Sequence, residues 1–266
     1  MNKLPENAQG LILDMDGVLW ADSQALIDLP ATFSRFKERN LAVTLATNNS
    51  TRTVEQYLEK LAGFGVIVEP WQVITSALAV AELLAGRFPA ETPLFAIGGE
   101  GLMQALKAKG FEILPVEKAP EAEAVVFGID RAINFEKMVE ATLLVRAGKP
   151  FYATNADKTF PTPRGQIPGA GAWLSVITTA SGIEPTIAGK PQTAMLQMAL
   201  DRLGTPKETT YVIGDRLETD IAGGQALGCP TALVLTGIAT REQGAAWRPK
   251  IDIIGESLWA LVRRSG

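Results

Sequence analysis

Histidine is absent from the sequence, and cysteine occurs once, at Cys229. The absence of histidine excludes Ser-His-Asp and Cys-His catalysis, histidine-rich zinc sites and phosphohistidine chemistry. A single cysteine excludes an intrachain disulfide. Acid–base chemistry must therefore use Asp, Glu, Lys or Tyr, and any metal is expected to be a hard cation bound through oxygen.

Long apolar runs and an excess of positive charge are also missing. No run approaches the roughly 18 apolar residues that span a membrane, and the opening MNKLPENAQG lacks the apolar core of a signal peptide. We therefore expect a cytoplasmic protein that does not bind membranes. The net charge of −4 argues against nucleic acid as the main partner.

Strand-like and helix-like segments alternate along the chain. Short runs rich in Val, Ile and Leu are separated by segments of helical period, several of which end in glycine. This alternation predicts an α/β protein with a parallel sheet whose strands are buried on both faces. Connectors that contain Gly and Pro, at 86–93 and 181–189, predict a core formed by 1–85 and 186–266 and an inserted domain of 86–185.

Several apolar runs end in reactive side chains. LILD ends at Asp14, with Asp16 and Gly17 after it; AVTLATNN ends at Thr47 and Asn48; TIAGK ends at Lys190; and YVIGD ends at Asp215, with Asp220 further on. In open parallel sheets, ligands bind at the carboxyl ends of the strands. If these strands are neighbours, carboxylates, a hydroxyl, an amide and a lysine meet at one edge.

Each of these residues also has a structural interpretation. The aspartates could cap turns or helices, Thr47 and Asn48 could begin a helix, and Lys190 could be a solvated loop residue. These explanations would have to hold together at every strand end. The occurrence of reactive residues at every one of these strand ends favours a shared function, because each end supplies a residue type that phosphoryl transfer needs.

Phosphoryl transfer uses such a set directly. A carboxylate attacks phosphorus to form an acyl phosphate, while a second, protonated carboxyl gives its proton to the leaving oxygen and then activates water. Carboxylates gathered at one point repel each other unless a cation such as Mg²⁺ lies between them. A hydroxyl, amides and a lysine stabilise the transition state. Gly17 lets the chain turn sharply so that Asp14 and Asp16 both face the site.

Four features resemble, in order and spacing, the motifs of the haloacid dehalogenase (HAD) superfamily: DMDGVLW, ATNNS, Lys190 and GDRLETD. Three longer stretches resemble its NagD/4-nitrophenylphosphatase branch, which includes phosphoglycolate and pyridoxal phosphatases. They are TNNSTRT, ATNADKTFPTPRGQIPGAGAW and AGKP. The resemblance covers essentially the whole chain. It implies a Rossmann-like doubly wound parallel sheet with an inserted α/β cap domain, and a Mg²⁺-dependent phosphatase that acts on small phosphorylated metabolites through an aspartyl-phosphate.

The resemblance also implies roles at the strand ends. Asp14 would be the nucleophile and Asp16 the general acid/base, while Thr47, Asn48 and Lys190 would bind the phosphoryl group. Dehalogenase members of the superfamily need no metal and lack a second aspartate at the position of Asp16. The pair of aspartates therefore indicates phosphate chemistry.

The same motifs imply a metal site. Mg²⁺ would be held by Asp14, the backbone carbonyl of Asp16 and Asp215, with Asp220 nearby through a water. These ligands are carboxylate and carbonyl oxygens, which are the donors that Mg²⁺ prefers.

The cap is implied to select the substrate. Asn155, Asp157 and Phe160 in the stretch NADKTFP would contribute to the leaving-group pocket. Pyridoxal phosphatases have a histidine near the position of Phe160, so its absence here argues against pyridoxal phosphate. The branch often dimerises through its caps, which makes a homodimer an expectation. Trp20, just past Gly17, is expected to line the substrate entrance.

Two other functions stay open at this point. A phosphomutase or phosphotransferase would use the same intermediate and would pass the phosphoryl group to an acceptor alcohol. A non-catalytic protein that binds phosphorylated ligands could retain the same scaffold. The intact set of reactive residues argues against this second alternative.

Overall fold

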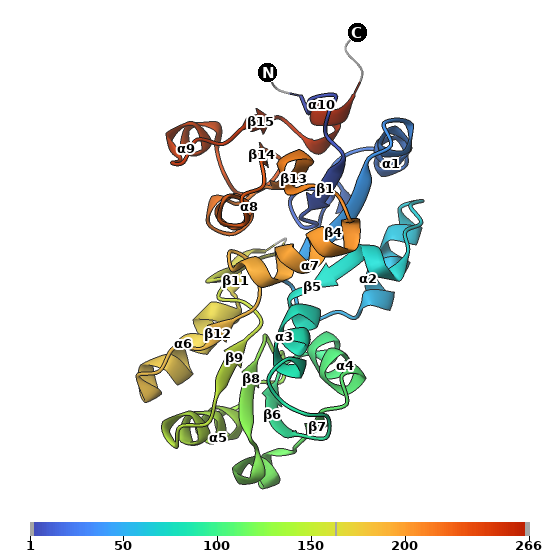
Figure 1. The fold of residues 1–266 in the computed structure, drawn as a ribbon. Helices are drawn as coiled ribbons and strands as arrows, with labels where there is room; N and C mark the ends of the chain where they lie inside the picture. The colour runs from blue at the N-terminus through green and yellow to red at the C-terminus, as the bar shows by residue number, and fades with distance from the viewer. Residues whose placement is uncertain (1–2, 163, 264–266) are drawn as a thin grey trace. The chain divides into compact units, whose positions relative to one another are not determined.

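The computed structural model describes residues 3–162 and 164–263 and divides into two compact units. The first unit consists of Met1–Thr47, Glu55–Ile74 and Lys190–Gly266, and the second unit consists of Asn48–Val54 and Thr75–Gly189. Figure 1 labels most of the helices and strands of both units.

The first unit contains a six-stranded sheet in the order β15-β14-β13-β1-β4-β5. Its strands are β1 (Gly10–Leu13), β4 (Ala42–Thr47), β5 (Val73–Thr75), β13 (Thr210–Gly214), β14 (Thr231–Val234) and β15 (Ile253–Gly255). Strand β1 pairs in parallel with both β13 and β4, so that Ile12 lies opposite Val212 and Thr44. All residues of β1 are buried, as expected for a central parallel strand. The predicted Rossmann-like parallel sheet is confirmed.

The direction of strand addition reverses at β1. The chain adds β4 and β5 on one side of β1, and later adds β13, β14 and β15 on the other side. At such a switch point, the loops after the two diverging strands leave a crevice at the carboxyl edge of the sheet. The residues that follow β1 and β13 are therefore brought together at this edge.

Helices and short turns connect these strands. They are α1 (Leu29–Glu38), α2 (Val54–Gly63), α7 (Thr193–Leu203), α8 (Ala222–Leu227), α9 (Arg241–Ala246), α10 (Leu258–Val262), η1 (Pro70–Gln72), η3 (Lys207–Thr209), the π-helical turn η4 (Leu217–Ile221) and the hairpin of β2 (Trp20–Ala21) and β3 (Gln24–Ala25). Local sequence fixes the helix ends: Asp28 caps α1 by accepting from the backbone N–H of Ala31, and α7 ends at Gly204 in a left-handed conformation.

The second unit contains a five-stranded parallel sheet in the order β12-β9-β8-β6-β7. Its strands are β6 (Pro93–Ile97), β7 (Glu112–Ile113), β8 (Ala124–Phe127), β9 (Phe151–Ala153) and β12 (Thr186–Ile187), and an antiparallel hairpin is formed by β10 (Thr159–Thr162) and β11 (Gly165–Pro168). The run TIAGK, which begins the expected core segment 186–266, does not join the sheet of the first unit. Its strand β12 pairs instead with Tyr152 and Ala153 of β9, and the chain enters the first unit only at Lys190.

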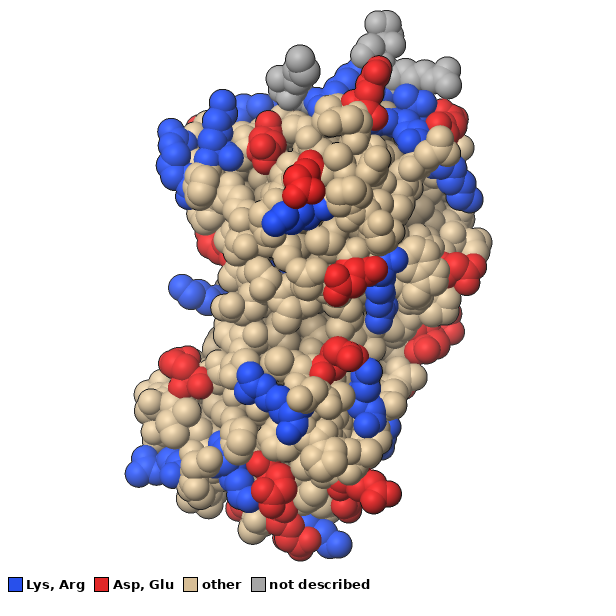
Figure 2. Space-filling view, in the orientation of Figure 1, with Lys and Arg blue, Asp and Glu red and all other residues tan. Residues whose placement is uncertain are grey.

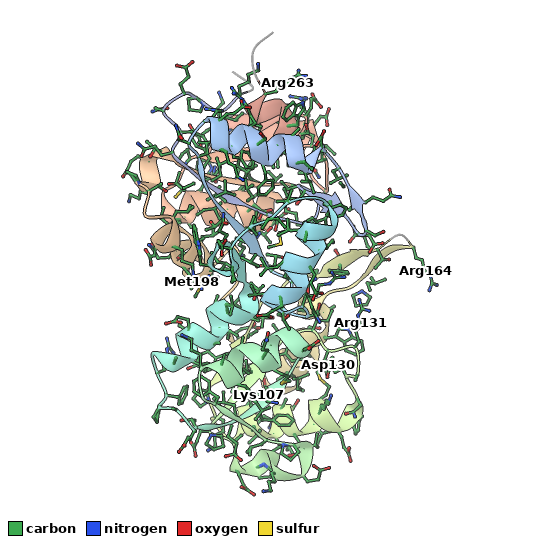
Figure 3. All side chains as sticks on the ribbon, turned by 90° about the vertical axis from the view of Figure 1, so that its right-hand side faces the viewer. Lys107, Asp130, Arg131, Arg164, Met198 and Arg263 are labelled. Atoms are coloured by element: carbon green, nitrogen blue, oxygen red, sulfur yellow. The ribbon has the colours of Figure 1, made fainter. Side chains whose placement is uncertain are left out.

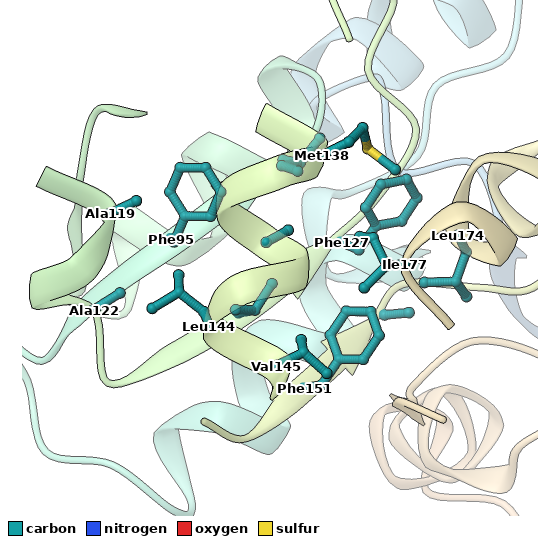
Figure 4. Packing of buried hydrophobic residues seen from close by; sticks show 14 of the residues in the cluster. Phe95, Ala119, Ala122, Phe127, Met138, Leu144, Val145, Phe151, Leu174 and Ile177 are labelled. Atoms are coloured by element: carbon teal, nitrogen blue, oxygen red, sulfur yellow. The ribbon is translucent and has the colours of Figure 1, made fainter. Parts of the chain in front are cut away.

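Packed aromatic and aliphatic side chains form the core of the second unit. Its helices are α3 (Ser76–Ala85), α4 (Glu100–Ala108), α5 (Phe135–Arg146), α6 (Ala170–Ser181) and the short η2 (Val116–Glu121). Figure 4 shows Phe127 and Phe151 of the sheet packed with Val145 of α5 and with Leu174 and Ile177 of α6. This core is independent of the first unit's sheet, so the loops of the second unit have a rigid support of their own.

The second unit begins earlier in the chain than the expected residue 86. Helix α3 packs against α4 and therefore joins this unit, although it precedes the connector rich in Gly and Pro. The segment Asn48–Val54 joins it as well: the Ser76 hydroxyl donates a hydrogen bond of 2.6 Å to the backbone carbonyl of Asn48. Such a segment has no compositional signal, because its membership depends on contacts with distant residues.

Charged groups of both signs are interspersed on the face of the molecule that Figure 2 shows. Within the described residues, no helix combines the length and the apolar character that crossing a membrane requires.

Candidate active site

Three carboxylates meet at the carboxyl edge of the first unit's sheet. Asp14 follows β1, Asp215 follows β13, and Asp220 lies in the turn η4; one oxygen from each lies within 4.8 Å of the others. The side chain of Asp220 is 1% exposed. Like charges this close and this buried destabilise one another unless a cation compensates them.

Lys190 supplies one compensating charge. Its Nζ donates to Asp14 Oδ1 at 2.7 Å, to Asp220 Oδ1 at 2.6 Å and to the backbone carbonyl of Ala46 at 2.8 Å. Burial alone would lower the pKa of Lys190, but the two carboxylates outweigh it and raise this pKa above its usual value. Lys190 is therefore a fixed cation that ties Asp14 to Asp220.

One ammonium group does not balance the acidic cluster. Burial, together with the charges of Asp220 and Asp215, raises the pKa of Asp14 well above its usual value despite the opposing effect of Lys190. Burial and the charge of Asp220 likewise raise the pKa of Asp215 to about 6. The site thus holds more negative potential than its own cation neutralises, which favours the binding of a further cation.

The residues around Asp215 fit a divalent cation. Its Oδ2 accepts from the backbone N–H of Ile238 at 2.8 Å, while its Oδ1 is buried without a hydrogen-bond partner among the described residues. Gly17 and Gly237 leave room for this carboxylate, because a Cβ at either position would overlap its oxygen. An unpartnered buried carboxylate oxygen beside Asp14 is suited to a hard cation such as Mg²⁺.

The loop after β14 belongs to this site, and the sequence analysis missed it. The Thr236 hydroxyl donates to the backbone carbonyl of Gly17 at 2.6 Å, and Ile238 supplies the N–H for Asp215. These contributions come from a hydroxyl and from backbone groups, which carry no distinctive residue-type pattern. The signal that could have found them is the position of Thr236 and Gly237 just beyond a fourth strand end.

Asp16 is held by the indole of Trp20. The Nε1 of Trp20 donates to Asp16 Oδ1 at 2.9 Å, and Gly17 between them adopts φ 86°, which confirms the sharp turn expected there. Trp20 is 0% exposed. The expectation that it lines the substrate entrance is therefore wrong: the ring is buried in the first unit because it packs against Phe64.

Thr47 and Asn48 fall on different units although they are adjacent in the chain. Thr47 ends β4 and is buried in the first unit. The Asn48 amide donates to both carboxylate oxygens of Asp157 at 3.2 Å, and Asn155 Nδ2 donates to the backbone carbonyl of Asn48 at 2.8 Å. The structure thus brings Asn48, Asn155 and Asp157 together within the second unit.

Phe160 lines a pocket of about 330 Å³ within the second unit. The other lining residues are Asn49, Thr51, Ile129, Asp130, Arg131, Ile133, Ile167, Pro168 and Trp173. Most of these side chains are apolar. Arg131 and Asp130, labelled in Figure 3, supply charge, and Asp130 accepts from Lys137 Nζ at 2.6 Å.

Comparison with known proteins agrees with this geometry. Residues 11–112 match the family model of haloacid dehalogenase-like hydrolases, and residues 187–261 match a second HAD hydrolase-like model. An acid sugar phosphatase from Staphylococcus epidermidis is 38% identical over 235 residues, which are 88% of this chain and 89% of that protein.

Solved structures of phosphatases share the whole fold. A p-nitrophenyl phosphatase from Archaeoglobus fulgidus has a TM-score of 0.88 and 34% identity, with 96% of this chain and 98% of that chain covered. A glycerol phosphate phosphatase from Mycobacterium tuberculosis, in complex with magnesium, has a TM-score of 0.90 and 30% identity, with 100% and 80% covered.

The chain belongs to the haloacid dehalogenase-like hydrolase family. Within this family it is a phosphatase, and its cofactor is Mg²⁺. The fold, the class of enzyme and the cofactor that the sequence motifs imply are therefore confirmed.

Proposed function

We propose that Asp14 is the nucleophile with which this phosphatase hydrolyses small phosphorylated metabolites. The observation that carries the proposal is the position of Asp14 at the switch point of the sheet, hydrogen-bonded to Lys190 and close to Asp215 and Asp220. Its carboxylate oxygen attacks phosphorus, and the bond from phosphorus to the leaving oxygen breaks. The resulting acyl phosphate divides one difficult displacement into two easier ones.

Asp16 serves as the general acid/base in this proposal. In the first step its carboxyl gives a proton to the leaving oxygen, and in the second step its carboxylate takes a proton from the attacking water. Water then displaces Asp14 from phosphorus and releases inorganic phosphate. The hydrogen bond from Trp20 supports this assignment, because it gives the side chain of Asp16 a defined orientation.

The remaining charged and polar groups bind and orient the phosphoryl group. Asp14, Asp215 and the backbone carbonyl of Asp16 would hold Mg²⁺, with Asp220 acting through a water, and the unpartnered Oδ1 of Asp215 supports this assignment. When bound, Mg²⁺ neutralises charge on the phosphoryl oxygens. Lys190, which already donates to Asp14, would donate to the same oxygens.

Thr47 and Asn48 complete the proposed phosphate site. Thr47 would donate its hydroxyl to a phosphoryl oxygen, and Asn48 would bind the same phosphoryl group. Their position at the carboxyl end of β4, the strand next to β1, supports these roles. The contacts of Asn155 and Asp157 with Asn48 would keep the segment Asn48–Val54 in place.

We assign the second unit as a cap that receives the leaving group. Its pocket is wholly formed by its own residues, and one of them, Asn49, is only two residues from Thr47 in the chain. Phe160 and Trp173 would form the apolar wall of the leaving-group pocket. Replacing either by alanine should raise KM for aryl phosphates more than it lowers kcat.

The first test is hydrolysis of 4-nitrophenyl phosphate with Mg²⁺ and with EDTA. We expect wild-type turnover that requires the metal and that disappears in Asp14→Asn, with the circular dichroism spectrum unchanged. Asp28→Asn, in the exposed cap of α1, is the matched control and should keep full activity. Substantial turnover by Asp14→Asn would refute the nucleophile, and transfer of phosphate to added alcohols in preference to water would favour a phosphotransferase.

We further propose a cytoplasmic homodimer that forms through the second unit. Phe135 and Leu143 on α5 are 84% and 56% exposed, and Val176 on the neighbouring α6 is 46% exposed. An apolar surface of this kind is typical of a protein interface. Sedimentation velocity should give a dimer for the wild type and a monomer for Leu143→Glu, and a wild-type monomer would refute the proposal.

A further inference from the structure

The indole N–H of Trp20 donates to a charged group although the ring is buried. A buried indole N–H needs a hydrogen-bond acceptor. Here the acceptor is the carboxylate of Asp16, at 2.9 Å, and the ring itself is 0% exposed. A carboxylate that accepts from a fixed donor has a restricted orientation.

Two side chains and a backbone hydrogen bond hold the ring of Trp20 in place. Lys60 Nζ lies 4.1 Å from the ring centroid, and the Phe64 ring stacks with a centroid separation of 5.9 Å and an interplanar angle of 20°. The backbone carbonyl of Trp20 accepts from the N–H of Gly17 at 2.8 Å. Lys60 also donates to the backbone carbonyl of Asp22 at 2.7 Å. Asp22 lies in the turn between β2 and β3, so the same lysine also binds the hairpin that carries Trp20.

Helix α2 provides this support from a distant part of the sequence. Lys60 lies on α2, and Phe64 follows directly after it. The indole therefore connects the turn after β1 to α2 through a stacked ring, a cation–π contact and a charge-assisted hydrogen bond. Together these contacts define one position for the N–H.

From this geometry we infer that Trp20 is a positioning residue for the proton transfers of Asp16. The inference rests on the proposed role of Asp16 as general acid/base. An aspartate in a turn samples several rotamers, and only those that point its carboxyl at the leaving oxygen are productive. The N–H of Trp20 holds Oδ1 and so restricts the side chain to one orientation.

The chemical consequence depends on the leaving group. A leaving oxygen of high pKa needs its proton in the transition state, whereas 4-nitrophenolate leaves readily without one. Loss of the indole N–H should therefore slow the first step for poor leaving groups and spare it for good ones. General acid catalysis contributes about 10²–10⁴-fold, so imperfect positioning should cost about tenfold for the poorest leaving group.

The variant that isolates this effect is Trp20→Phe. Phenylalanine keeps an aromatic ring in contact with Lys60 and Phe64 and removes the N–H that donates to Asp16. The measurement is kcat/KM with saturating Mg²⁺ for substituted phenyl phosphates, from 4-nitrophenyl to 4-methoxyphenyl, plotted against leaving-group pKa. This parameter reports formation of the acyl phosphate, the step in which the leaving group departs.

We expect the slope of this plot to be shallow for the wild type, steep for Asp16→Asn and intermediate for Trp20→Phe. The matched control is Trp247→Phe, which removes an indole N–H that donates to Gln225 at 3.0 Å within the same unit. It should give the wild-type slope. Lys60→Met, which removes the cation above the ring, should steepen the slope less than Trp20→Phe does.

The outcomes distinguish the general acid role of Asp16 from the positioning role of Trp20. A wild-type slope in Asp16→Asn would overturn the proposed acid and, with it, the positioning role. A steep slope in Asp16→Asn but a wild-type slope in Trp20→Phe would overturn the positioning role alone, whether the variant loses activity uniformly or not at all. If Trp20→Phe does not fold, the slope of Lys60→Met decides: a wild-type slope there overturns the inference.

Discussion

Replacing Asp215 by asparagine should stabilise the protein when metal is absent. Asp215 is 1% exposed, and burial together with the charge of Asp220 raises its pKa from 3.8 to about 6. The folded state therefore binds this proton more tightly than the unfolded state does. The stability of the wild type falls as the pH rises from about 4 to about 6, and the full cost is present above that range.

The size of the effect follows from the shift in pKa. A difference of about two units corresponds to about 3 kcal/mol, which is the upper bound on the cost of the charged carboxylate at pH 8. Asparagine cannot ionise, and its carbonyl can still accept from the N–H of Ile238. After allowance for the desolvated amide, we expect Asp215→Asn to be about 1–3 kcal/mol more stable than the wild type in EDTA at pH 8.

Urea unfolding, followed by tryptophan fluorescence, measures this difference. In EDTA the advantage of Asp215→Asn should be large at pH 8 and should shrink towards zero near pH 4. Adding Mg²⁺ at pH 8 should reverse the order, because a ligand at about 100 times its Kd stabilises the wild type by about 3 kcal/mol and the variant has lost a ligand. Asp28→Asn, outside the site, should respond to Mg²⁺ as the wild type does.

Two results would refute the reasoning. If Asp215→Asn is less stable than the wild type in EDTA at pH 8, the carboxylate is not under electrostatic strain in the folded state. If the difference between the two proteins is the same at pH 4 and pH 8, ionisation of Asp215 is not its cause.

Further changes test other parts of the structure. Gly237→Ala places a methyl group on the carboxylate oxygen of Asp215, so calorimetric titration should show at least tenfold weaker Mg²⁺ binding; unchanged affinity would mean that the loop can move aside. Lys190→Met leaves Asp14 facing other carboxylates without its cation, so the free energy of unfolding in EDTA should fall by about 3–5 kcal/mol. A loss below about 1 kcal/mol would argue against a buried ion pair. Phe127→Ala opens a cavity in the second unit and should lower its free energy of unfolding by about 3–5 kcal/mol. Hydrogen exchange should show the loss of protection in that unit, and an equal loss in both units would contradict two separate cores.

Much of the site could be predicted because parallel sheets obey a simple rule. Strand ends on either side of a switch point meet, so Asp14 and Asp215 could be paired from apolar runs that end in carboxylates. Lys190 reaches the same place without ending a strand of that sheet, because its long side chain extends into the cluster from the loop before α7. Residue type indicated its presence there, although the strand before it pairs with β9 in the second unit.

The parts that could not be predicted depend on backbone groups and on distant contacts. The N–H of Ile238 would be the same whatever side chain stood at that position, so no residue pattern marks it as a partner of Asp215. Trp20 is the last residue of the first motif, DMDGVLW, which suggests proximity to substrate. Its burial is decided by Phe64 and Lys60, and hydrophobic periodicity does not encode that pairing.

The segment Asn48–Val54 has a practical consequence for exchanging parts between relatives. This short piece is separated in the chain from the rest of its unit, yet its Asn48 carbonyl accepts from both Ser76 and Asn155, and its Asn48 amide donates to Asp157. A chimera that imports only 75–189 would pair these donors and acceptors with a foreign segment. Modular exchange therefore requires a graft in two pieces, and natural variation at 48–54 should track variation in the insertion rather than in the neighbouring strand and helix.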